Sequence, residues 1–342
     1  MKPNPSLPRT VVVHHRSGIG DLIWHIPYLR AIAAASRDGK VSLIARPSCR
    51  AAEVLAAESC IDEIIDFDRR PRSVEQRRGR HEGFSAQRAF VRELQARQFG
   101  RIYIFSGRPR YALLAMLAGI PERAGFGFSA IERLFLNLPP YIQRHRGAGN
   151  WVYPEVTDFC ITHGLVSGPV VPQMEVLASE LLVAEQDLAG LTGPRYAFSI
   201  GTSKPRNDWG SANFAALAAC LAERGCSIVL LGGEAERAAA AALVAALPAR
   251  WQARVMVAAQ ASIQRSAALL RHCDYCVGND TGALNMALAN GVPSLGLFGA
   301  SQPLTHDPRL QALSARGMDA ILPATVVARL VTLGAPGFDS GT

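Results

Sequence analysis

A short stretch near the N-terminus puts a carboxylate where it can do chemistry. Residues 14–33 read HHRSGIGDLIWHIPYLRAIA, with Asp21 directly after two close glycines and after the strand-like run Val11–Val13. The glycines Gly18 and Gly20 let the backbone approach a ligand closely. An acid at such a junction can cap a helix, neighbour a phosphate loop or act as a general base. A dinucleotide fingerprint and a P-loop are excluded, because the third glycine and the GK[ST] sequence are missing.

A second stretch, residues 199–209, combines small polar side chains with cations after a strand. It reads SIGTSKPRNDW. The amides and hydroxyls of Thr202 and Ser203 can cradle phosphates, and Lys204 or Arg206 can neutralise them. The alternative is a long loop around a buried tryptophan, and we favour the phosphate role because small polar residues and cations coincide at a strand end.

Two further stretches carry acids and glycines at the start of helices. In LLGGEAER, residues 230–237, Glu234 can bind ribose hydroxyls or be an ordinary acid of a helix N-terminus. In VGNDTGALNMA, residues 277–287, the amides of Thr281 and Gly282 should be unpaired at a helix start and form an anion site. A phosphate would repel Asp280, so we expect this residue to orient the loop or to bind sugar hydroxyls. This last stretch is the most specific local signal in the chain.

These stretches alternate with short apolar strands and amphipathic helices, which predicts parallel, doubly wound α/β sheets. The expected strands are 10–14, 41–45, 102–106, 196–200, 227–231, 254–258, 275–278 and 294–298. The expected helices are 21–36, 48–58, 85–98, 110–118, 152–164, 211–224, 234–246, 262–271, 282–290 and 324–333, and Pro27 should kink or delimit the first. We predict two Rossmann-like domains that face a central cleft, residues 1–168 and 195–342, joined by a linker over 169–194. Ligands should bind at the carboxyl ends of the strands.

Charge and composition narrow the class of protein. The chain has 342 residues and a net charge of +8. Between Arg69 and Arg110, twelve arginines face three glutamates, so this segment carries the whole basic excess. Such a segment suits an anionic lipid surface or acidic glycan, or is simply a solvated face. It lacks the interleaved aromatics of a nucleic-acid platform, so no nucleic-acid partner is expected. An odd number of cysteines and no apolar run of membrane-spanning length or signal-peptide type favour a reduced, cytoplasmic setting.

Two short motifs can be mistaken for metal sites. Cys273 and Cys276 form a lone CxxC without a second pair, and zinc sites need four ligands. Asp66 and Asp68 form a DxD triplet that we interpret as a turn at a strand end. We therefore expect no bound metal.

Taken together in chain order, these motifs resemble glycosyltransferase family 9, the lipopolysaccharide heptosyltransferase group with the GT-B fold. The resemblance covers nearly the whole chain. It is carried by Gly18-x-Gly20-Asp21-x5-Pro27, Gly201-Thr202-Ser203 to Trp209, Gly232-Gly233-Glu234, Asp280-Thr281-Gly282, and Gly291-Val292-Pro293 to Phe298-Gly299.

The resemblance implies a function and a role for each motif. Family members transfer a sugar, typically heptose from an ADP-linked donor, to the lipopolysaccharide inner core at the cytoplasmic face of the inner membrane. Their chemistry inverts the anomeric centre, and neither a metal nor a cofactor is expected. Asp21 matches the general base, with Gly18 and Gly20 in the acceptor loop. Glu234 matches the ribose contact, and Asp280, Thr281 and Gly282 match the loop for donor sugar and pyrophosphate. We therefore expect an anionic glycolipid acceptor and peripheral membrane contact through Arg69–Arg110.

Two positions depart from the family pattern. Asn207 stands where the family often has lysine, although Lys204 and Arg206 lie nearby, and Asn285 stands where the family often has histidine. Asparagine can donate to a phosphate but carries no charge. The alternatives are therefore a GT-B transferase or epimerase that uses another nucleotide sugar, or a non-catalytic homologue that binds nucleotide sugars.

Overall fold

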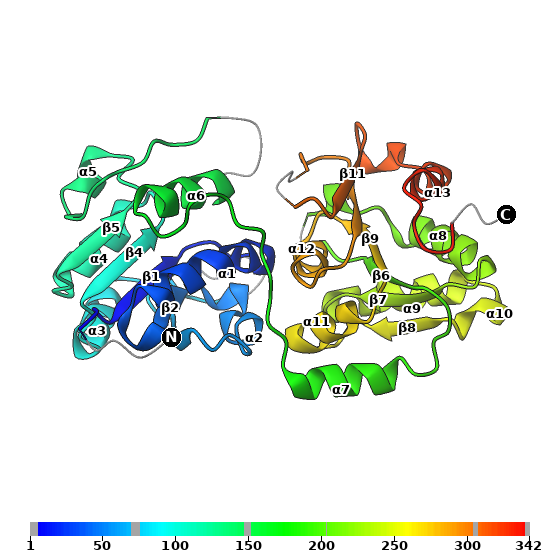
Figure 1. Cartoon of the computed structure of the whole chain (residues 1–342), viewed down its shortest axis with the longest axis horizontal. Coiled ribbons are helices and arrows are strands. Elements are labelled where there is room, and N and C mark those ends of the chain that lie inside the picture. The colour runs from blue at the N-terminus through cyan, green and yellow to red at the C-terminus, as the bar shows by residue number, and fades with distance from the viewer. Residues whose placement is uncertain (1–5, 70–75, 147–151, 203, 304–306, 339–342) are drawn as a thin grey trace. The chain divides into compact units, whose positions relative to one another are not determined.

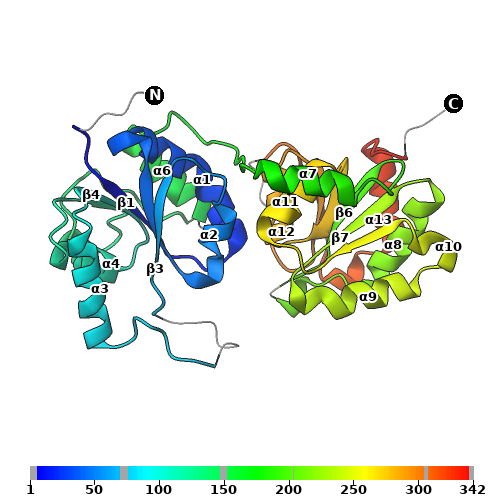
Figure 2. The same ribbon diagram turned by 90° about the horizontal axis from the view of Figure 1, so that it is seen from below.

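The chain divides into two compact units, Met1–Pro172 and Gln173–Thr342. The computed structural model describes residues 6–69, 76–146, 152–202, 204–303 and 307–338. Each unit holds its own parallel sheet with helices on both faces (Figures 1 and 2). The expected linker, 169–194, spans the boundary and contains helix α7 (Ala178–Asp187). Because Ala184 of this helix is buried and α7 packs against α11 (Ile263–Arg271), most of the expected linker is part of the second unit.

The first unit contains a five-stranded sheet with the order β3-β2-β1-β4-β5, in which all neighbours are parallel. Helices α1 and α2 pack together, as do α1 and α6, while α3 packs against α4. The strands are β1 (Thr10–His14), β2 (Val41–Ala45), β3 (Ile61–Asp66), β4 (Arg101–Phe105) and β5 (Glu122–Gly125). The helices are α1 (Ile19–Ala34), η1 (Arg37–Gly39), η2 (Pro47–Cys49), α2 (Ala51–Val54), α3 (Phe84–Ala96), α4 (Pro109–Leu117), α5 (Ala130–Arg133) and α6 (Val152–Thr162).

The second unit contains a six-stranded parallel sheet with the order β11-β10-β9-β6-β7-β8. Helices α8, α9 and α13 form one packed group, and α7, α11 and α12 form another. The strands are β6 (Arg195–Ser199), β7 (Ser227–Leu231), β8 (Val255–Ala258), β9 (Tyr275–Asn279), β10 (Ser294–Phe298) and β11 (Leu310–Ser314). The helices after α7 are η4 (Pro205–Asn207), α8 (Ser211–Glu223), η5 (Glu234–Glu236), α9 (Arg237–Ala246), α10 (Ala249–Gln252), α11, α12 (Gly282–Ala289), η6 (Met318–Ala320) and α13 (Pro323–Thr332).

The central strands are apolar and buried on both sides, which is why the sequence predicts them. Strands 10–14, 41–45, 227–231 and 294–298 are observed with the expected bounds, and every residue in them is buried. Three strands were not expected: β3, β5 and β11. Each lies at an edge of its sheet, where charged or small residues replace the apolar run.

Three expected helices differ from those observed. Helix α1, expected at 21–36, spans Ile19–Ala34 and is not delimited by Pro27. Residues 22–29 are all buried, as in a helix that is enclosed by its domain. The expected helix 48–58 is a 3-10 turn followed by the short α2, because Arg50 between them adopts a left-handed conformation with φ 50°. The expected helix 234–246 likewise begins as the 3-10 turn η5 and becomes α-helical at Arg237.

The strand orders define a switch point in each sheet. From β1 the chain proceeds towards β2 and β3 on one side and later towards β4 and β5 on the other. In the second sheet the same reversal falls between β6 and β9. Ligands of doubly wound sheets bind outside the carboxyl ends of the strands at such points. The loops after β1, β6 and β9, which carry three of the four motifs, all begin there.

Candidate functional site

Asp21 lies in the first turn of α1, immediately beyond the carboxyl end of β1. Gly18 is the residue before the helix and Gly20 is buried in its first turn, and both have negative φ angles. A Cβ atom on Gly18 would lie 2.7 Å from Asp21 Oδ2. In this structure Gly18 therefore leaves room for the Asp21 carboxylate itself, rather than supplying a left-handed turn. Asp21 is partly exposed, as a base that meets substrate must be.

Arginines from four loops gather beyond the carboxyl ends of the first sheet. The pKa of His15, which follows β1, is lowered to about 4, chiefly by burial. The hydrogen bond with Phe105 O opposes this shift, and three nearby positive charges add to it: Arg16, Arg108 and Arg46. Burial raises the pKa of Tyr111 at the start of α4, and four positive charges oppose that rise: Arg108, Arg110, Arg46 and Arg69. These arginines follow β1, β2, β3 and β4, so they form one basic edge.

Two guanidinium nitrogens of this basic edge are buried without a hydrogen bond. They are Arg16 Nε and Arg69 Nη1, for which the described residues provide no acceptor. A buried donor without a partner costs free energy, about 1–3 kcal/mol, which a bound anion would recover. The five arginines of the basic edge, Arg16, Arg46, Arg69, Arg108 and Arg110, therefore suit a phosphate or carboxylate ligand.

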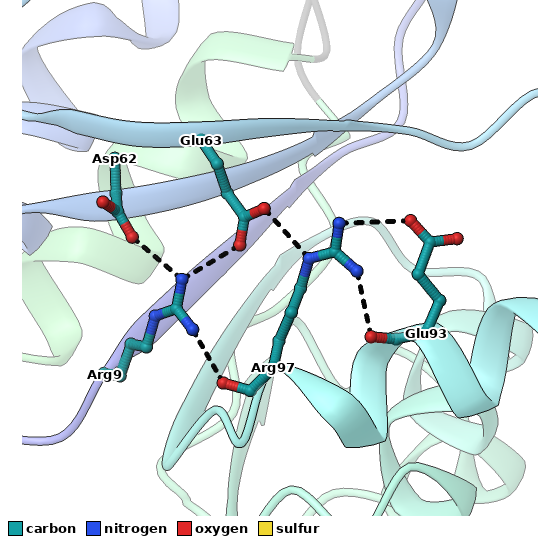
Figure 3. A network of polar contacts seen from close by, with 5 residues as sticks. All are labelled: Arg9, Asp62, Glu63, Glu93 and Arg97. Atoms are coloured by element: carbon teal, nitrogen blue, oxygen red, sulfur yellow. Dashed lines mark hydrogen bonds and ion pairs between the residues drawn. The ribbon is translucent and has the colours of Figure 1, made fainter.

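The arginine-rich segment 69–110 separates into groups with different environments. Arg97 belongs to an internal network with Glu63 and Glu93, and Arg9 binds Asp62 and Glu63 (Figure 3). Arg77 pairs with Asp68, and Arg101 pairs with Glu122. Arg77 and Arg108 are exposed, and so are four arginines that belong to neither these ion pairs nor the basic edge: Arg78, Arg80, Arg88 and Arg92. Arg70 and Arg72 lie outside the described residues. The segment is thus partly neutralised internally, and its exposed charge is concentrated before and along α3.

In the loop after β6, the residues that were expected to bind phosphate lie in different environments: some are exposed, and Asn207 is buried. Thr202 Oγ1 accepts a hydrogen bond from Lys204 N at 3.2 Å, and the side chains of Lys204 and Arg206 are exposed. Asn207 ends η4 and is 3% exposed, so the 3-10 turn directs it inward. Its Oδ1 atom has no hydrogen-bond partner among the residues that the structure describes. Ser203 lies outside the described residues.

The loops after β6 and β9 are tied together at the switch point. Asn279 is fully buried, accepts a hydrogen bond from Trp209 N at 3.1 Å and donates one to Ile200 O at 2.9 Å. The hydroxyl oxygens of Ser199 and Thr281 lie 2.7 Å apart. Ser199 and Asn279 lie within the stretches 199–209 and 277–287 described above, yet neither was among the predicted site residues. An asparagine directly after an apolar strand is the signal that could have identified one of them.

Helix α12 begins beside this junction, shortly after the end of β9 at Asn279. Thr281 precedes the helix, Gly282 starts it, and Asn285 is in its first turn, partly exposed. Asp280 Oδ2 accepts a hydrogen bond from Ser301 Oγ at 2.7 Å. The structure therefore supports the expectation that Asp280 orients the loop, through a residue that follows β10.

The two acids after β7 occupy different environments. The Glu234 side chain is 63% exposed, forms an ion pair with Arg237 at 2.6 Å and accepts a hydrogen bond from Gln260 at 2.6 Å. Glu236 instead accepts a hydrogen bond from Gly233 N at 2.7 Å and lies against Gly201, where a Cβ atom would approach its Cδ to 2.9 Å. Sequence reasoning selected Glu234, whereas Glu236 is the acid that lies over the ends of β6 and β7.

A cavity of about 180 Å³ opens at the ends of these strands. Its lining combines the apolar residues Ile200, Phe214 and Leu243 with polar residues that include Thr202, Asp208, Ser211 and Glu236. A concave site that combines apolar side chains with convergent polar groups is a candidate for small-molecule binding. It brings Thr202 and Glu236 together and does not include Glu234.

Metal-binding side chains do not converge in the described part of the chain. No group of three or more His, Cys, Asp or Glu residues there could hold an ion. Asp66 ends β3, and Asp68 binds Arg77, as expected for a strand-end turn. All seven cysteines are free, and burial raises the pKa of Cys276 to about 12, so the CxxC pair is unreactive.

Two doubly wound units with ligand-type loops at their switch points define the class of GT-B proteins, and comparison with known proteins agrees. The model of "Glycosyltransferase family 9 (heptosyltransferase)" matches residues 87–318. Because this is more than half of the chain, the protein belongs to glycosyltransferase family 9 and is a glycosyltransferase.

Relatives and solved structures extend the match to almost the whole chain. Lipopolysaccharide heptosyltransferase 2 of Escherichia coli is 23% identical over 88% of this chain and 87% of its own length. A family 9 glycosyltransferase from Veillonella parvula has a TM-score of 0.78 at 20% identity, covering 95% of this chain and 97% of that one. The E. coli ADP-heptose heptosyltransferase II structure has a TM-score of 0.72 at 20% identity, covering 95% and 98%. Both structural similarities confirm the predicted GT-B fold.

Within the described residues, no helix combines the length and apolarity needed to cross a bilayer.

Proposed function

We propose that this glycosyltransferase transfers heptose from ADP-heptose to a lipopolysaccharide inner-core or related acceptor. The observation that carries the proposal is the position of Asp21, in the first turn of α1 at the switch point of the first sheet. The relatives support the substrates, because their printed names include lipopolysaccharide and ADP-heptose. A solved E. coli heptosyltransferase with an ADP-linked fluoroheptose, at 18% identity and a TM-score of 0.70, supports the same donor class.

The proposed reaction is a single inverting displacement. The acceptor hydroxyl oxygen forms a bond to the anomeric carbon while its proton passes to the Asp21 carboxylate. The bond from that carbon to the β-phosphate oxygen of ADP breaks on the opposite face. The growing charge on the diphosphate is met by Lys204, Arg206 and the amides at the start of α12. No metal ion is needed for this charge balance.

The donor is held by the second unit. The proposed donor-binding residues are Thr202, Ser203, Lys204, Arg206, Asn207, Glu234, Asp280, Thr281, Gly282 and Asn285. The junction between Ser199 and Thr281 supports this set, because it fixes the phosphate loops of β6 and β9 next to each other. Glu236 joins the set on the evidence of the cavity, where it accompanies Thr202.

The acceptor is anionic and is held by the first unit, at the basic edge of Arg16, Arg46, Arg69, Arg108 and Arg110. The buried, unpaired nitrogens Arg16 Nε and Arg69 Nη1 support an anionic ligand there. Gly18 and Gly20 belong to the acceptor loop beside Asp21.

The enzyme acts at the cytoplasmic face of the inner membrane, as a peripheral protein. Within the segment Arg69–Arg110, the exposed arginines Arg78, Arg80, Arg88 and Arg92 supply the contact with anionic lipid. Phe84, which is 84% exposed at the start of α3, adds an aromatic ring suited to the membrane interface.

A second candidate uses the same fold with another nucleotide sugar, as a transferase or an epimerase. Asn285 favours it, since a neutral amide replaces a family histidine beside the phosphate loop. The inward-facing Asn207 favours it as well, because it removes a family lysine without offering its amide to the loop surface.

A donor panel tests both candidates. Titration calorimetry with ADP-heptose, ADP-glucose, UDP-glucose and UDP-N-acetylglucosamine is followed by transfer assays on heptose-free lipopolysaccharide. We expect selective binding and turnover of ADP-heptose. Asp21→Asn should retain donor affinity and lose about 1,000-fold in kcat, within the range for a general base. Selection of another donor supports the second candidate, and an Asp21→Asn enzyme with wild-type kcat rejects the base assignment.

A further inference from the structure

Two buried histidines join the end of β1 to helix α1. His14, the last residue of β1, is 1% exposed, and His25 of α1 is 2% exposed. Their Nδ1 atoms lie 2.7 Å apart, which is the distance of a hydrogen bond. One ring must donate an Nδ1 proton to the other, because two bare nitrogen lone pairs would repel each other. Neither histidine has a role in the proposed chemistry.

The environment of the pair makes this bond specific. The two rings meet edge to face with centroids 4.8 Å apart, and Phe105 of β4 packs against the edge of His25 at 5.4 Å. Burial lowers the pKa of His14 well below its usual value, so its ring is neutral at physiological pH. A neutral imidazole that is buried among aromatic side chains has few other hydrogen-bond partners for its ring nitrogens.

The first turn of α1 needs such support. The backbone bond that closes this turn, from Leu22 N to Gly18 O, is long at 3.4 Å. Gly18, the residue before the helix, has no side chain with which to cap the helix N-terminus. Asp21 occupies this turn, and His25 lies four residues later, on the same side of the helix. The bond between His14 and His25 therefore ties the face of α1 that carries Asp21 to the end of β1.

The loop that joins β1 to α1 is short, and a second contact fixes it at its β1 end. Residues 15–18 connect His14 to the helix, and the adjacent His15 Nδ1 lies 2.6 Å from Phe105 O. Consequently, the hydrogen bond between His14 and His25 links the two ends of the segment 14–25, which includes the whole glycine loop. Loss of this bond would free α1 to shift against β1 at the turn where Asp21 sits.

We propose that the hydrogen bond between His14 and His25 positions Asp21 for proton abstraction. His14 and His25 are positioning residues, since they act through α1 and touch no reacting atom. The inference rests on the proposed function only where it names Asp21 as the base; the clamp itself is a property of the first unit.

The test compares variants that break or preserve this bond. His25→Leu removes the polar atoms, whereas His25→Asn retains an amide at the distance of Nδ1 from the backbone. We expect His25→Leu to lower kcat by about 100-fold, as small displacements of reacting groups do, with the KM for ADP-heptose unchanged. His25→Asn should restore kcat to within about fivefold of wild type, the range of one altered neutral hydrogen bond. His14→Leu should resemble His25→Leu, and the double variant should be no worse than either, because all three lose the same bond.

Tyr28→Phe is the matched control. Tyr28 is also buried in α1, and its hydroxyl lies 2.5 Å from Thr157 Oγ1 of α6. This variant removes a buried side-chain hydrogen bond from the same helix, two turns beyond Asp21, and should keep the wild-type kcat. Equal kcat values for His25→Leu and Tyr28→Phe would overturn the proposal.

Hydrogen exchange separates the clamp from the choice of base. The amides of Leu22 and Ile23 should exchange at least about fivefold faster in His25→Leu than in wild type, and at the wild-type rate in Tyr28→Phe. If Asp21→Asn keeps its turnover, the base assignment fails, and the exchange rates still decide whether the clamp exists. Unchanged exchange in His25→Leu would reject the clamp whatever the kinetics.

Discussion

The hydroxyl oxygens of Ser199 and Thr281 lie 2.7 Å apart and join the last residue of β6 to the residue before α12. Gly278 is paired with Ser199 in the sheet and leaves the space for it, since a Cβ atom there would collide with Ser199 Cβ. This junction fixes two phosphate-type loops, whose joined residues are 82 positions apart in the chain, at one switch point. The donor site proposed for the second unit depends on it.

Ser199→Ala should weaken ADP binding. The substitution removes one neutral hydrogen bond, worth about 1 kcal/mol, so the dissociation constant measured by calorimetry should rise about fivefold. Ser294→Ala is the control, because Ser294 Oγ donates to Val292 O in the buried strand β10 and touches neither loop. Wild-type affinity in Ser199→Ala would show that the junction does not shape the donor site.

Gly18→Ala should lower turnover without unfolding the protein. The new Cβ atom would lie 2.7 Å from Asp21 Oδ2 and must push the carboxylate away. We expect kcat to fall at least about tenfold in the transfer assay, with donor affinity unchanged. Gly168→Ala, where a Cβ atom meets nothing within 4 Å, should match wild type in both. If the two alanine variants behave alike, Asp21 is not held in its active position by Gly18.

Charge reversal along α3 should weaken membrane attachment. Arg88→Glu/Arg92→Glu should reduce co-sedimentation with phosphatidylglycerol vesicles by at least about tenfold, since each basic residue near an anionic surface contributes about 1 kcal/mol. Binding of the wild type should also decrease steeply as salt rises, because screening shortens the reach of exposed charges.

The control for this experiment reverses two charges at the opposite end of the first sheet. Arg37→Glu/Lys40→Glu changes exposed residues near the amino end of β2 and should leave vesicle binding almost unaltered. Equal losses in the two double variants would mean that net charge alone, rather than the α3 surface, governs attachment. Binding to phosphatidylcholine vesicles that equals binding to anionic ones would reject the electrostatic model.

The free energy of unfolding should depend on pH through His15. Its pKa is lowered to about 4 in the folded protein, so between pH 4 and the unfolded value of about 6.5 the unfolded chain binds more protons. Stability should therefore rise with pH across this window, by at most about 1.4 kcal/mol per pH unit for one such group. Chemical denaturation of His15→Asn should show a shallower rise than wild type. Parallel curves would show that His15 is not buried among the arginines as described.

Much of the fold could be predicted, and the missed strands have a common cause. The central strands are apolar runs between turn residues, and four of them were predicted to the residue. The missed strands β3, β5 and β11 are all edge strands, whose exposed side permits charged residues and erases the apolar run. The pairs Gly168-Pro169 and Gly193-Pro194 predict a linker across 169–194. This prediction misses helix α7, whose packing partner α11 follows 76 residues later.

The motif loops could also be predicted, but the basic edge could not. Arg16, Arg46, Arg69 and Arg108 are spread over 93 residues and belong to no shared motif. They meet because parallel strands deliver every following loop to the same edge of the sheet. For the arginine-rich segment the sequence left a lipid or glycan contact and a solvated face open. The structure adds that Arg97 and Arg101 form ion pairs within the first unit.

The sequence by itself determined the fold class, the family resemblance and the loops in which Asp21, Thr202 and Asp280 lie, because strand periodicity and glycine spacing are local properties. Only the tertiary structure decided which side chains these loops present. It turned Asn207 inward, left Glu234 exposed beside Gln260, and brought Glu236 over the ends of β6 and β7. The physical reason is that side-chain direction depends on the exact turn of each helix start and on partners distant in the chain, as the pair of His14 and His25 also illustrates.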